Sequence, residues 1–264
     1  MNYTLITGAS GGIGWELARQ FAAGGHALIL VARSEARLLE RKAQLEKEFS
    51  VTVEILTQDL IQPNAAQAVF DTAAANGWTV DILVNNAGFG DFTSFIDADF
   101  QHQADMVTLN VTALMQLTHC FARAMREQGG GRILNVASLA AVAPGPYMAT
   151  YYATKAFVLS FSEAMSEELA EYGITVTALC PGPTESNFET AANLKSGNLF
   201  SALPVETAEK VARRGYKATM KGRAVRYCGI TVCMMSFLSR FSPRWLNRKT
   251  TKRINGKPQK GENV

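Results

Sequence analysis

The stretch that decides the fold is Thr4-Leu5-Ile6-Thr7-Gly8-Ala9-Ser10-Gly11-Gly12-Ile13-Gly14. An apolar β-rich run leads here through a glycine-rich turn into an amphipathic helix. Glycine has no Cβ, so amide groups at a helix N-terminus can closely approach a diphosphate, whose negative charge the helix dipole favours. A tight turn without a ligand gives the same pattern. The position of this one, between the first strand and the first helix, favours a cofactor-binding turn.

Apolar β-rich runs alternate with amphipathic helical stretches along the chain. The runs are Tyr3–Thr7, His26–Ala32, Thr52–Thr57, Asp81–Asn85, Arg132–Ala137 and Ile174–Cys180, with a short one at Ala224–Cys228. The helical stretches include Gly12–Gly24, Glu35–Phe49, Ala65–Asn76 and Thr150–Tyr172. Such alternation predicts an α/β doubly wound fold, with a mostly parallel seven-stranded sheet and helices on both faces.

Length and composition indicate one globular domain, because 264 residues with 47% hydrophobic side chains can bury a large core. We expect a single dinucleotide-binding and catalytic domain at 1–250, with a cofactor half at about 1–130 and a catalytic and substrate half at about 131–250. A basic mobile tail is expected at 251–264.

The start of the chain resembles no secretory signal, which predicts a cytoplasmic protein. The four cysteines are scattered and form no metal-binding pattern, so we expect reduced thiols. The three histidines fall at a strand start and on helical stretches, where a structural role is expected. We therefore expect no metal site.

The net charge of +3 conceals an uneven distribution of charge. Fifteen Lys or Arg and no Asp or Glu lie between Lys210 and Lys260, which leaves eleven basic and twenty-two acidic side chains in the first 209 residues. Such a segment is attracted to anionic lipid, nucleic acid, an acidic substrate or the acidic surface of another subunit. We expect no nucleic-acid partner.

The second strand is followed by Arg33, where a dinucleotide site selective for NAD carries an acidic residue for the ribose 2′-hydroxyl. A guanidinium at that place suits the 2′-phosphate of NADP, with Ser10 as a second contact. An exposed arginine that only begins a helix would look the same. We favour NADP(H) over NAD(H).

A second group of polar residues lies farther along, at Ser138, Tyr151 and Lys155. Tyr151 and Lys155 are four apart on an expected helix and therefore share one face. A lysine and a positively charged nicotinamide within about 4–6 Å lower a tyrosine pKa by roughly 1–3 units, which makes the phenol a usable acid and base. Tyr152 is three residues from Lys155, so spacing alone does not choose between the two tyrosines.

Taken together, these motifs resemble the short-chain dehydrogenase/reductase family. The resemblance covers residues 2 to about 190 and rests on Thr7–Gly14, Asn85-Asn86-Ala87-Gly88, Asn110, Ser138, Tyr151-x-x-x-Lys155 and Pro181-Gly182, all in order. It implies a Rossmann-like fold and an NADP-dependent oxidoreductase that needs no metal. It also implies a homodimer or homotetramer, since this family commonly forms them.

The resemblance further implies a role for each matching position. Tyr151 would exchange a proton with the substrate oxygen, Ser138 would polarise that oxygen, Lys155 would bind the nicotinamide ribose and lower the tyrosine pKa, and Asn110 would hold a water linking Lys155 to solvent. The remaining cofactor contacts would be Gly8, Gly12, Ile13 and Gly14 at the diphosphate, Asp59 and Leu60 at the adenine, Asn86, Ala87 and Gly88 at the adenosine-side ribose, and Pro181, Gly182 and Thr184 around the nicotinamide.

The segments expected to roof the site are Phe89–Phe100, Ala140–Thr150 and the stretch after Thr184. Their apolar members favour an apolar substrate, such as an acyl chain, a steroid-like ring or an aromatic ketone. The alternative is that several of these aromatics only pack the loops. The apolar members are Phe89, Phe92, Phe95, Val142, Pro144, Pro146, Tyr147, Met148 and Phe188.

The apolar stretch Ile230–Leu238 and the Trp245 region that follows leave two interpretations open. The segment packs over the substrate pocket or against a second subunit, which we favour, or it forms an interfacial helix attracted to anionic lipid, a peripheral membrane contact.

For the whole chain we expect an NADP(H)-dependent carbonyl reductase or alcohol dehydrogenase. The rival is a regulatory or membrane-associated interaction protein that binds a cofactor with the same fold. An extended epimerase or dehydratase is disfavoured, because about eighty residues after Pro181 hardly supply a substrate domain.

Overall fold

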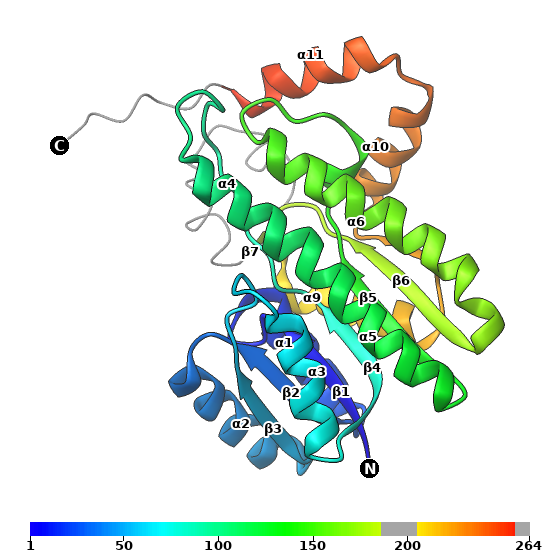
Figure 1. The fold of residues 1–264 in the computed structure, drawn as a ribbon. Helices are drawn as coiled ribbons and strands as arrows, with labels where there is room; N and C mark the ends of the chain where they lie inside the picture. The colour runs from blue at the N-terminus through cyan, green and yellow to red at the C-terminus, as the bar shows by residue number, and fades with distance from the viewer. Residues whose placement is uncertain (186–204, 257–264) are drawn as a thin grey trace.

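The computed structural model describes residues 1–185 and 205–256, and its centre is a seven-stranded parallel sheet (Figure 1). The strand order is β3-β2-β1-β4-β5-β6-β9. Chain order reverses between β1 and β4, so the carboxyl ends of these two strands form the switch point where ligands bind on such sheets. The strands are β1 (Asn2–Thr7), β2 (Ala27–Ala32), β3 (Val53–Thr57), β4 (Thr79–Asn85), β5 (Gly131–Val136), β6 (Ile174–Cys180) and β9 (Val225–Tyr227).

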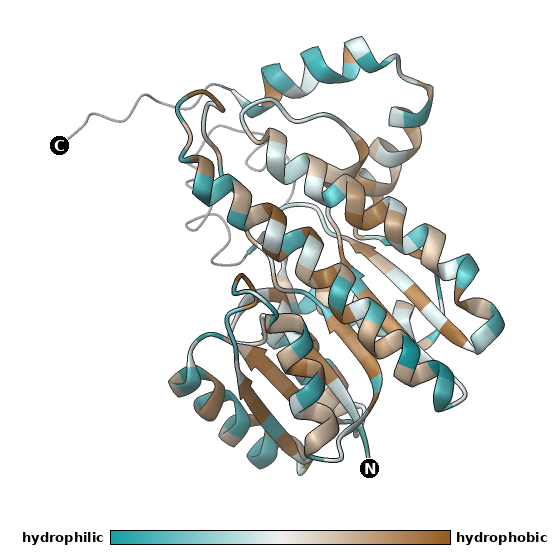
Figure 2. Ribbon diagram, in the orientation of Figure 1, coloured by the Kyte–Doolittle hydropathy of each residue, from teal (hydrophilic) through white to brown (hydrophobic). Residues whose placement is uncertain are grey.

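Helices cover both faces of the sheet, as the continuous apolar strands predicted. One core joins the sheet to α1 (Gly12–Ala23), α2 (Glu35–Phe49) and α9 (Ala208–Met220). The opposite core joins it to α3 (Ala65–Ala75), α5 (Leu114–Glu127) and α6 (Ala149–Glu168). The strands between these layers are the most hydrophobic part of the ribbon (Figure 2). The expected α/β doubly wound fold is confirmed.

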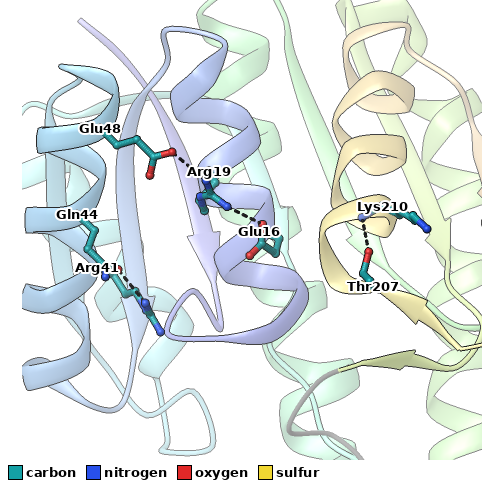
Figure 3. Close-up of polar contacts among 7 residues, drawn as sticks. All are labelled: Glu16, Arg19, Arg41, Gln44, Glu48, Thr207 and Lys210. Carbon is teal, nitrogen blue, oxygen red and sulfur yellow. Dashed lines mark hydrogen bonds and ion pairs between the residues drawn. The ribbon is translucent and has the colours of Figure 1, made fainter.

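Polar contacts join neighbouring helices at the surface (Figure 3). Arg19 on α1 contacts Glu16 on its own helix and Glu48 on α2, the latter at 2.8 Å. Thr207 caps the N-terminus of α9 by accepting a hydrogen bond from the Lys210 amide. Exposed pairs of this kind add little stability, so the two cores carry most of the fold.

The chain after β6 differs most from expectation. β7 (Thr184–Glu185) pairs in parallel with β8 (Glu206–Thr207). The last helices of the described chain are α10 (Ile230–Phe241) and α11 (Arg244–Asn255). Residues 251–255 of the expected mobile tail belong to α11, which buries Thr251 and Asn255. The rest of that tail, and Phe188, lie outside the described residues. Among the described helices, none is both long and apolar enough to cross a bilayer.

A buried polar ladder crosses the centre of the sheet. Asn135 on β5 is fully buried; it accepts a hydrogen bond from Asn85 on β4 at 2.9 Å and donates one to Ser162 on α6 at 2.9 Å. Asn85 also donates to Thr118 on α5 at 3.1 Å. These bonds link two strands to the two helices packed on them, because the side-chain amides of Asn85 and Asn135 donate across the element boundaries.

Replacing Asn135 with Ala tests this ladder. The substitution leaves buried polar groups of Asn85 and Ser162 without that partner, which costs about 1–3 kcal/mol of unfolding free energy. Urea denaturation measures the loss. The control is Asn2→Ala, at an exposed asparagine whose only side-chain hydrogen bond in the described residues is a 3.4 Å contact with Asp81, and it should change stability little. Equal effects of the two substitutions would contradict a stabilising role for the ladder.

Candidate functional site

The turn after β1 packs directly against the residues that follow β4. Gly8 has a φ of +66°, a conformation that favours glycine, and a Cβ there would lie 2.8 Å from Asn86 Nδ2. Asn86 Nδ2 donates to the Thr7 carbonyl at 2.9 Å, and the Thr7 hydroxyl accepts from the amides of Asn86 and Ala87 at 3.0 Å. These bonds fix the two loops at the switch point.

Gly14 supports this turn from below and does not line the groove, unlike the other expected diphosphate contacts. A Cβ at Gly14 would lie 2.3 Å from the Gly8 carbonyl oxygen, so only glycine lets α1 begin this close to the turn. Gly11, which the sequence-based set omitted, lines the groove in its place. The motif glycines therefore divide into those that face the groove and one that packs beneath them.

A continuous groove runs across the carboxyl ends of the strands. It consists of two cavities of about 360 and 490 Å³ that share Gly8, Ser10, Arg33 and Gly88 among their linings. Fourteen of the expected residues line the first cavity: Gly8, Ser10, Gly12, Ile13, Arg33, Asn86, Ala87, Gly88, Ser138, Tyr151, Lys155, Pro181, Gly182 and Thr184. Asp59 and Leu60 line the second. Residues from seven separate stretches of the chain thus meet at one edge of the sheet.

Two exposed arginines border the same end of the groove. Arg33 follows β2, and Arg37 lies one helical turn later on α2, where its amide donates to the capping Ser34 hydroxyl. Arg41 reaches back from α2 to the Ser10 carbonyl and lies 4.4 Å from the Trp15 ring centroid. Sequence reasoning missed Arg37, although its place in the first turn of the helix that begins just after Arg33 is a signal that it lies near the same end of the groove.

The reacting groups gather at the other end of the groove. Tyr151 and Lys155 are buried on α6, the Lys155 ammonium lies 5.9 Å from the Tyr151 ring centroid, and it donates to the Val136 carbonyl at 2.8 Å. Ser138 follows β5 and hydrogen-bonds to Tyr151. Tyr152 points elsewhere: it donates to Asn255 on α11 at 3.3 Å and does not line either cavity. Of the two tyrosines that spacing left open, Tyr151 is the one in the groove.

Burial moves the two titrating groups in opposite directions. Desolvation raises the pKa of Tyr151 to about 12, while its hydrogen bond with Ser138 acts the other way. Desolvation also lowers the pKa of Lys155 to about 8. Low-polarity surroundings disfavour both the phenolate and the ammonium, which explains the opposite signs. The protein's own groups therefore do not produce the lowered tyrosine pKa that the sequence suggested.

Asn110 lies behind the groove, at an irregularity in a long helical segment. It sits in a π-helical turn, Thr108–Ala113, between α4 (Phe100–Val107) and α5. Its side chain accepts from the Phe89 amide at 3.0 Å and donates to the Phe89 carbonyl at 2.8 Å and to Thr154 at 3.1 Å. A Cβ at Gly88 would lie 2.8 Å from Asn110 Oδ1, so Gly88 allows this close packing. Such π turns frequently mark functional sites.

The segments expected to roof the site contact one another. The Thr93 amide donates to the Tyr147 carbonyl at 2.9 Å, and the centroids of the Phe92 and Tyr147 rings lie 6.4 Å apart. Tyr147 has a φ of +69°, which a bulky side chain rarely adopts and which is typical of functional loops. Phe89 lines the groove, whereas Phe95 is exposed to solvent.

Residues 2–197 match the sequence profile described as short chain dehydrogenase. A curated relative is the very-long-chain 3-oxoacyl-CoA reductase of Laccaria bicolor, 36% identical over 181 residues. That match covers 67% of this chain and 53% of the relative. The chain thus spans about half the length of the curated relatives it matches there.

Solved structures match over nearly the whole chain. A short-chain dehydrogenase from Sphingobium yanoikuyae in complex with NADPH has a TM-score of 0.81 and 30% identity, and the match covers 99% of each chain. The bulky-bulky ketone specific alcohol dehydrogenase from Comamonas testosteroni has a TM-score of 0.76 and 30% identity, over 91% of this chain and 92% of that one.

The buried ammonium predicts a pH dependence of stability. Unfolded Lys155 titrates near 10.5 and folded Lys155 near 8, so between these values the unfolded chain binds more protons and stability rises with pH. We expect the stability of the native chain relative to Lys155→Met to rise by up to about 3 kcal/mol between about pH 7 and pH 10. Urea denaturation of both proteins at each pH measures it. Parallel pH profiles would show that Lys155 is not desolvated.

Proposed function

The chain belongs to the short-chain dehydrogenase family, and from this premise we propose that it is an NADP(H)-dependent oxidoreductase. It transfers a hydride between the nicotinamide and a carbonyl or secondary alcohol, with Tyr151 as general acid and base. The observation that carries the proposal is the convergence of Ser138, Tyr151 and Lys155 at one end of a groove whose other end is bordered by Arg33 and Arg37.

The groove fits a dinucleotide. Gly8, Gly11 and Gly12 keep side chains out of its floor, and they lead into the N-terminus of α1, which begins at Gly12 and carries no acidic residue in its first turn. A diphosphate there meets the helix dipole and no like charge. The second cavity, lined by Asp59, Leu60 and Leu109 among others, has the place and the mixed lining that an adenine needs.

Charge at the far end favours the phosphorylated cofactor. Arg33 and Arg37 both line the groove, and the second cavity places Ser10 beside them. Two guanidinium groups suit the dianionic 2′-phosphate of NADP. The 2′-hydroxyl of NAD is uncharged and does not require them. That the Sphingobium yanoikuyae structure is an NADPH complex is consistent with this preference.

The bound nicotinamide supplies the hydride chemistry, and the chain's own residues supply orientation and the proton. Ser138 donates a hydrogen bond to the substrate oxygen and thereby polarises it. Tyr151 gives its proton to that oxygen during reduction and takes it back during oxidation. The positive charge of Lys155, together with that of an oxidised nicotinamide, offsets the burial that raises the pKa of Tyr151. Asn110 holds the Phe89 backbone beside this proton path.

We propose an apolar carbonyl substrate. Phe89 lines the groove, and Phe92 packs with Met148 and the two tyrosines of α6 to form an apolar cluster beside Tyr151. A bulky apolar group next to the reacting oxygen would contact this wall. Acyl chains and bulky ketones both fit that chemistry, and such substrates appear in the names of the relatives from Laccaria bicolor and Comamonas testosteroni.

Substituting Arg33 with Asp tests the cofactor assignment. We expect NADPH binding to weaken by about 10-fold to 100-fold, because a charged hydrogen bond is lost and a repulsive carboxylate gained. NADH binding should not weaken. Nicotinamide fluorescence titration measures both. The matched control is Arg123→Asp, which makes the same charge change at an exposed site on α5, and equal weakening there would overturn the assignment.

Substituting Tyr151 with Phe tests the proton transfer. Turnover of an aromatic ketone with NADPH should fall by about 10²-fold to 10⁴-fold, because the phenolic proton is lost, while NADPH binding stays within a few-fold. Tyr152→Phe is the control, since Tyr152 lies outside both cavities. Unchanged turnover in Tyr151→Phe would refute Tyr151 as the proton donor, whereas NADPH binding without any turnover in the native protein would favour a cofactor-binding regulatory protein.

A further inference from the structure

Helix α10 carries its apolar face toward solvent. Its large apolar side chains follow helical spacing, so they form one stripe, which we name the α10 stripe: Ile230, Met234, Phe237, Leu238 and Phe241. Ile230 is 81% exposed and Phe241 74%. The residues that α10 buries are the smaller Val232 and Ser236. A surface helix of a globular protein normally has the opposite orientation, so this face lacks a covering within the described chain.

The end of α10 and the helix that follows it carry exposed positive charge. Arg240, at the end of α10, and five basic residues of α11 are exposed: Arg244, Arg248, Lys249, Lys252 and Arg253. No acidic residue occurs between Lys210 and Lys260. Trp245 is 55% exposed, with the Lys249 ammonium 5.5 Å from its ring centroid. Figure 2 shows α11 as largely hydrophilic, in contrast to the strands below it.

The helix pair is fixed to Gly182, which lines the groove, and to residues beside the groove. Asn255 of α11 donates to the Pro146 carbonyl at 2.9 Å and accepts from the Tyr152 hydroxyl at 3.3 Å. On α10, Val232 packs so closely on Gly182 that a Cβ there would lie 2.9 Å from it. The α10 stripe therefore has a defined orientation relative to the site, as a rigid docking surface requires.

A second exposed apolar group lies at the same end of the molecule. Figure 1 places α11 beside the loop that leads into α4. In and after that loop, Phe95 is 63% exposed, Ile96 90% and Phe100 77%. The segment that roofs the groove thus also exposes apolar side chains to solvent.

We propose that the α10 stripe and the basic face of α11 dock on the surface of an anionic phospholipid bilayer. The apolar side chains and Trp245 enter the headgroup region, and the lysines and arginines meet the lipid phosphates. Charge complementarity selects this partner. A second copy of the chain in a twofold dimer would place the same basic face against itself. A nucleic acid would bind the basic residues through its phosphates but would leave the α10 stripe exposed to water.

Vesicle binding of the full chain tests the proposal. We expect the protein to cosediment with vesicles of equal parts phosphatidylcholine and phosphatidylglycerol, and not with phosphatidylcholine alone. Added salt should weaken binding, because it screens the surface potential. Equal binding to both vesicles, or to neither, would overturn the proposal.

The stripe is tested by Phe237→Gln/Phe241→Gln, which should lose vesicle binding while unfolding free energy and NADPH binding are retained. Leu39→Gln is the control, because Leu39 is 52% exposed on the distant α2. If the double variant still bound vesicles, or changed the oligomeric mass in light scattering instead of vesicle binding, the face would not be a bilayer surface.

The charge is tested by Arg248→Gln/Lys252→Gln. Loss of two positive charges should lower vesicle partitioning roughly tenfold or more. The matched control, Lys47→Gln/Arg123→Gln, removes the same charge from exposed sites on α2 and α5. Equal losses in both would mean that net charge alone causes binding. Displacement of the protein from vesicles by duplex DNA, with tighter binding to the DNA, would favour nucleic acid and contradict the proposal.

Discussion

Gly8, Gly14 and Asn86 meet at the switch point of the sheet with no room for a Cβ between them. Asn86 bonds to the carbonyls of Thr7 and Gly8, and α1 begins directly behind that turn. Because the loops after β1 and β4 are locked together, the residues that follow them line one groove. The rest of the site lies on either side of this contact. The arginines follow β2, which pairs with β1, and the buried tyrosine and lysine lie on the helix after β5, which pairs with β4.

Much of the fold could be predicted from the sequence, because a strand that is apolar on both faces must be covered by other elements on both faces. Strands that are apolar throughout need helices on both faces, and the structure has them. The site was less predictable. Gly14 belongs to the motif, yet whether it faces ligand or packs beneath the turn depends on a contact with Gly8 that no spacing reveals. The π turn at Asn110 was equally hidden, since its sequence continues an ordinary helical pattern.

The opposite pKa shifts of Tyr151 and Lys155 have one cause, which is the exclusion of water from the inner end of the groove. A site this dry holds the phenol protonated and weakens the ammonium, so its own residues alone do not make an efficient acid and base at neutral pH. Charge brought by a cofactor acts strongly there because little solvent screens it. The proton chemistry of such a site is therefore coupled to cofactor binding. Lys155 contributes to that coupling through its position between the Val136 carbonyl and the Tyr151 ring.

An amphipathic helix has the same sequence pattern whether its apolar face turns inward or outward, which is why two interpretations of the C-terminal segment remained open. The inner face of α10 fixes which way the helix is turned. Val232 packs against Gly182, and a side chain larger than glycine at position 182 would not fit beneath it. That contact turns the stripe outward. Asn255 then fixes α11 over the loop that contains Pro146. Since Gly182 both lines the groove and packs against α10, a surface that held α10 and α11 would also set the direction in which the groove opens.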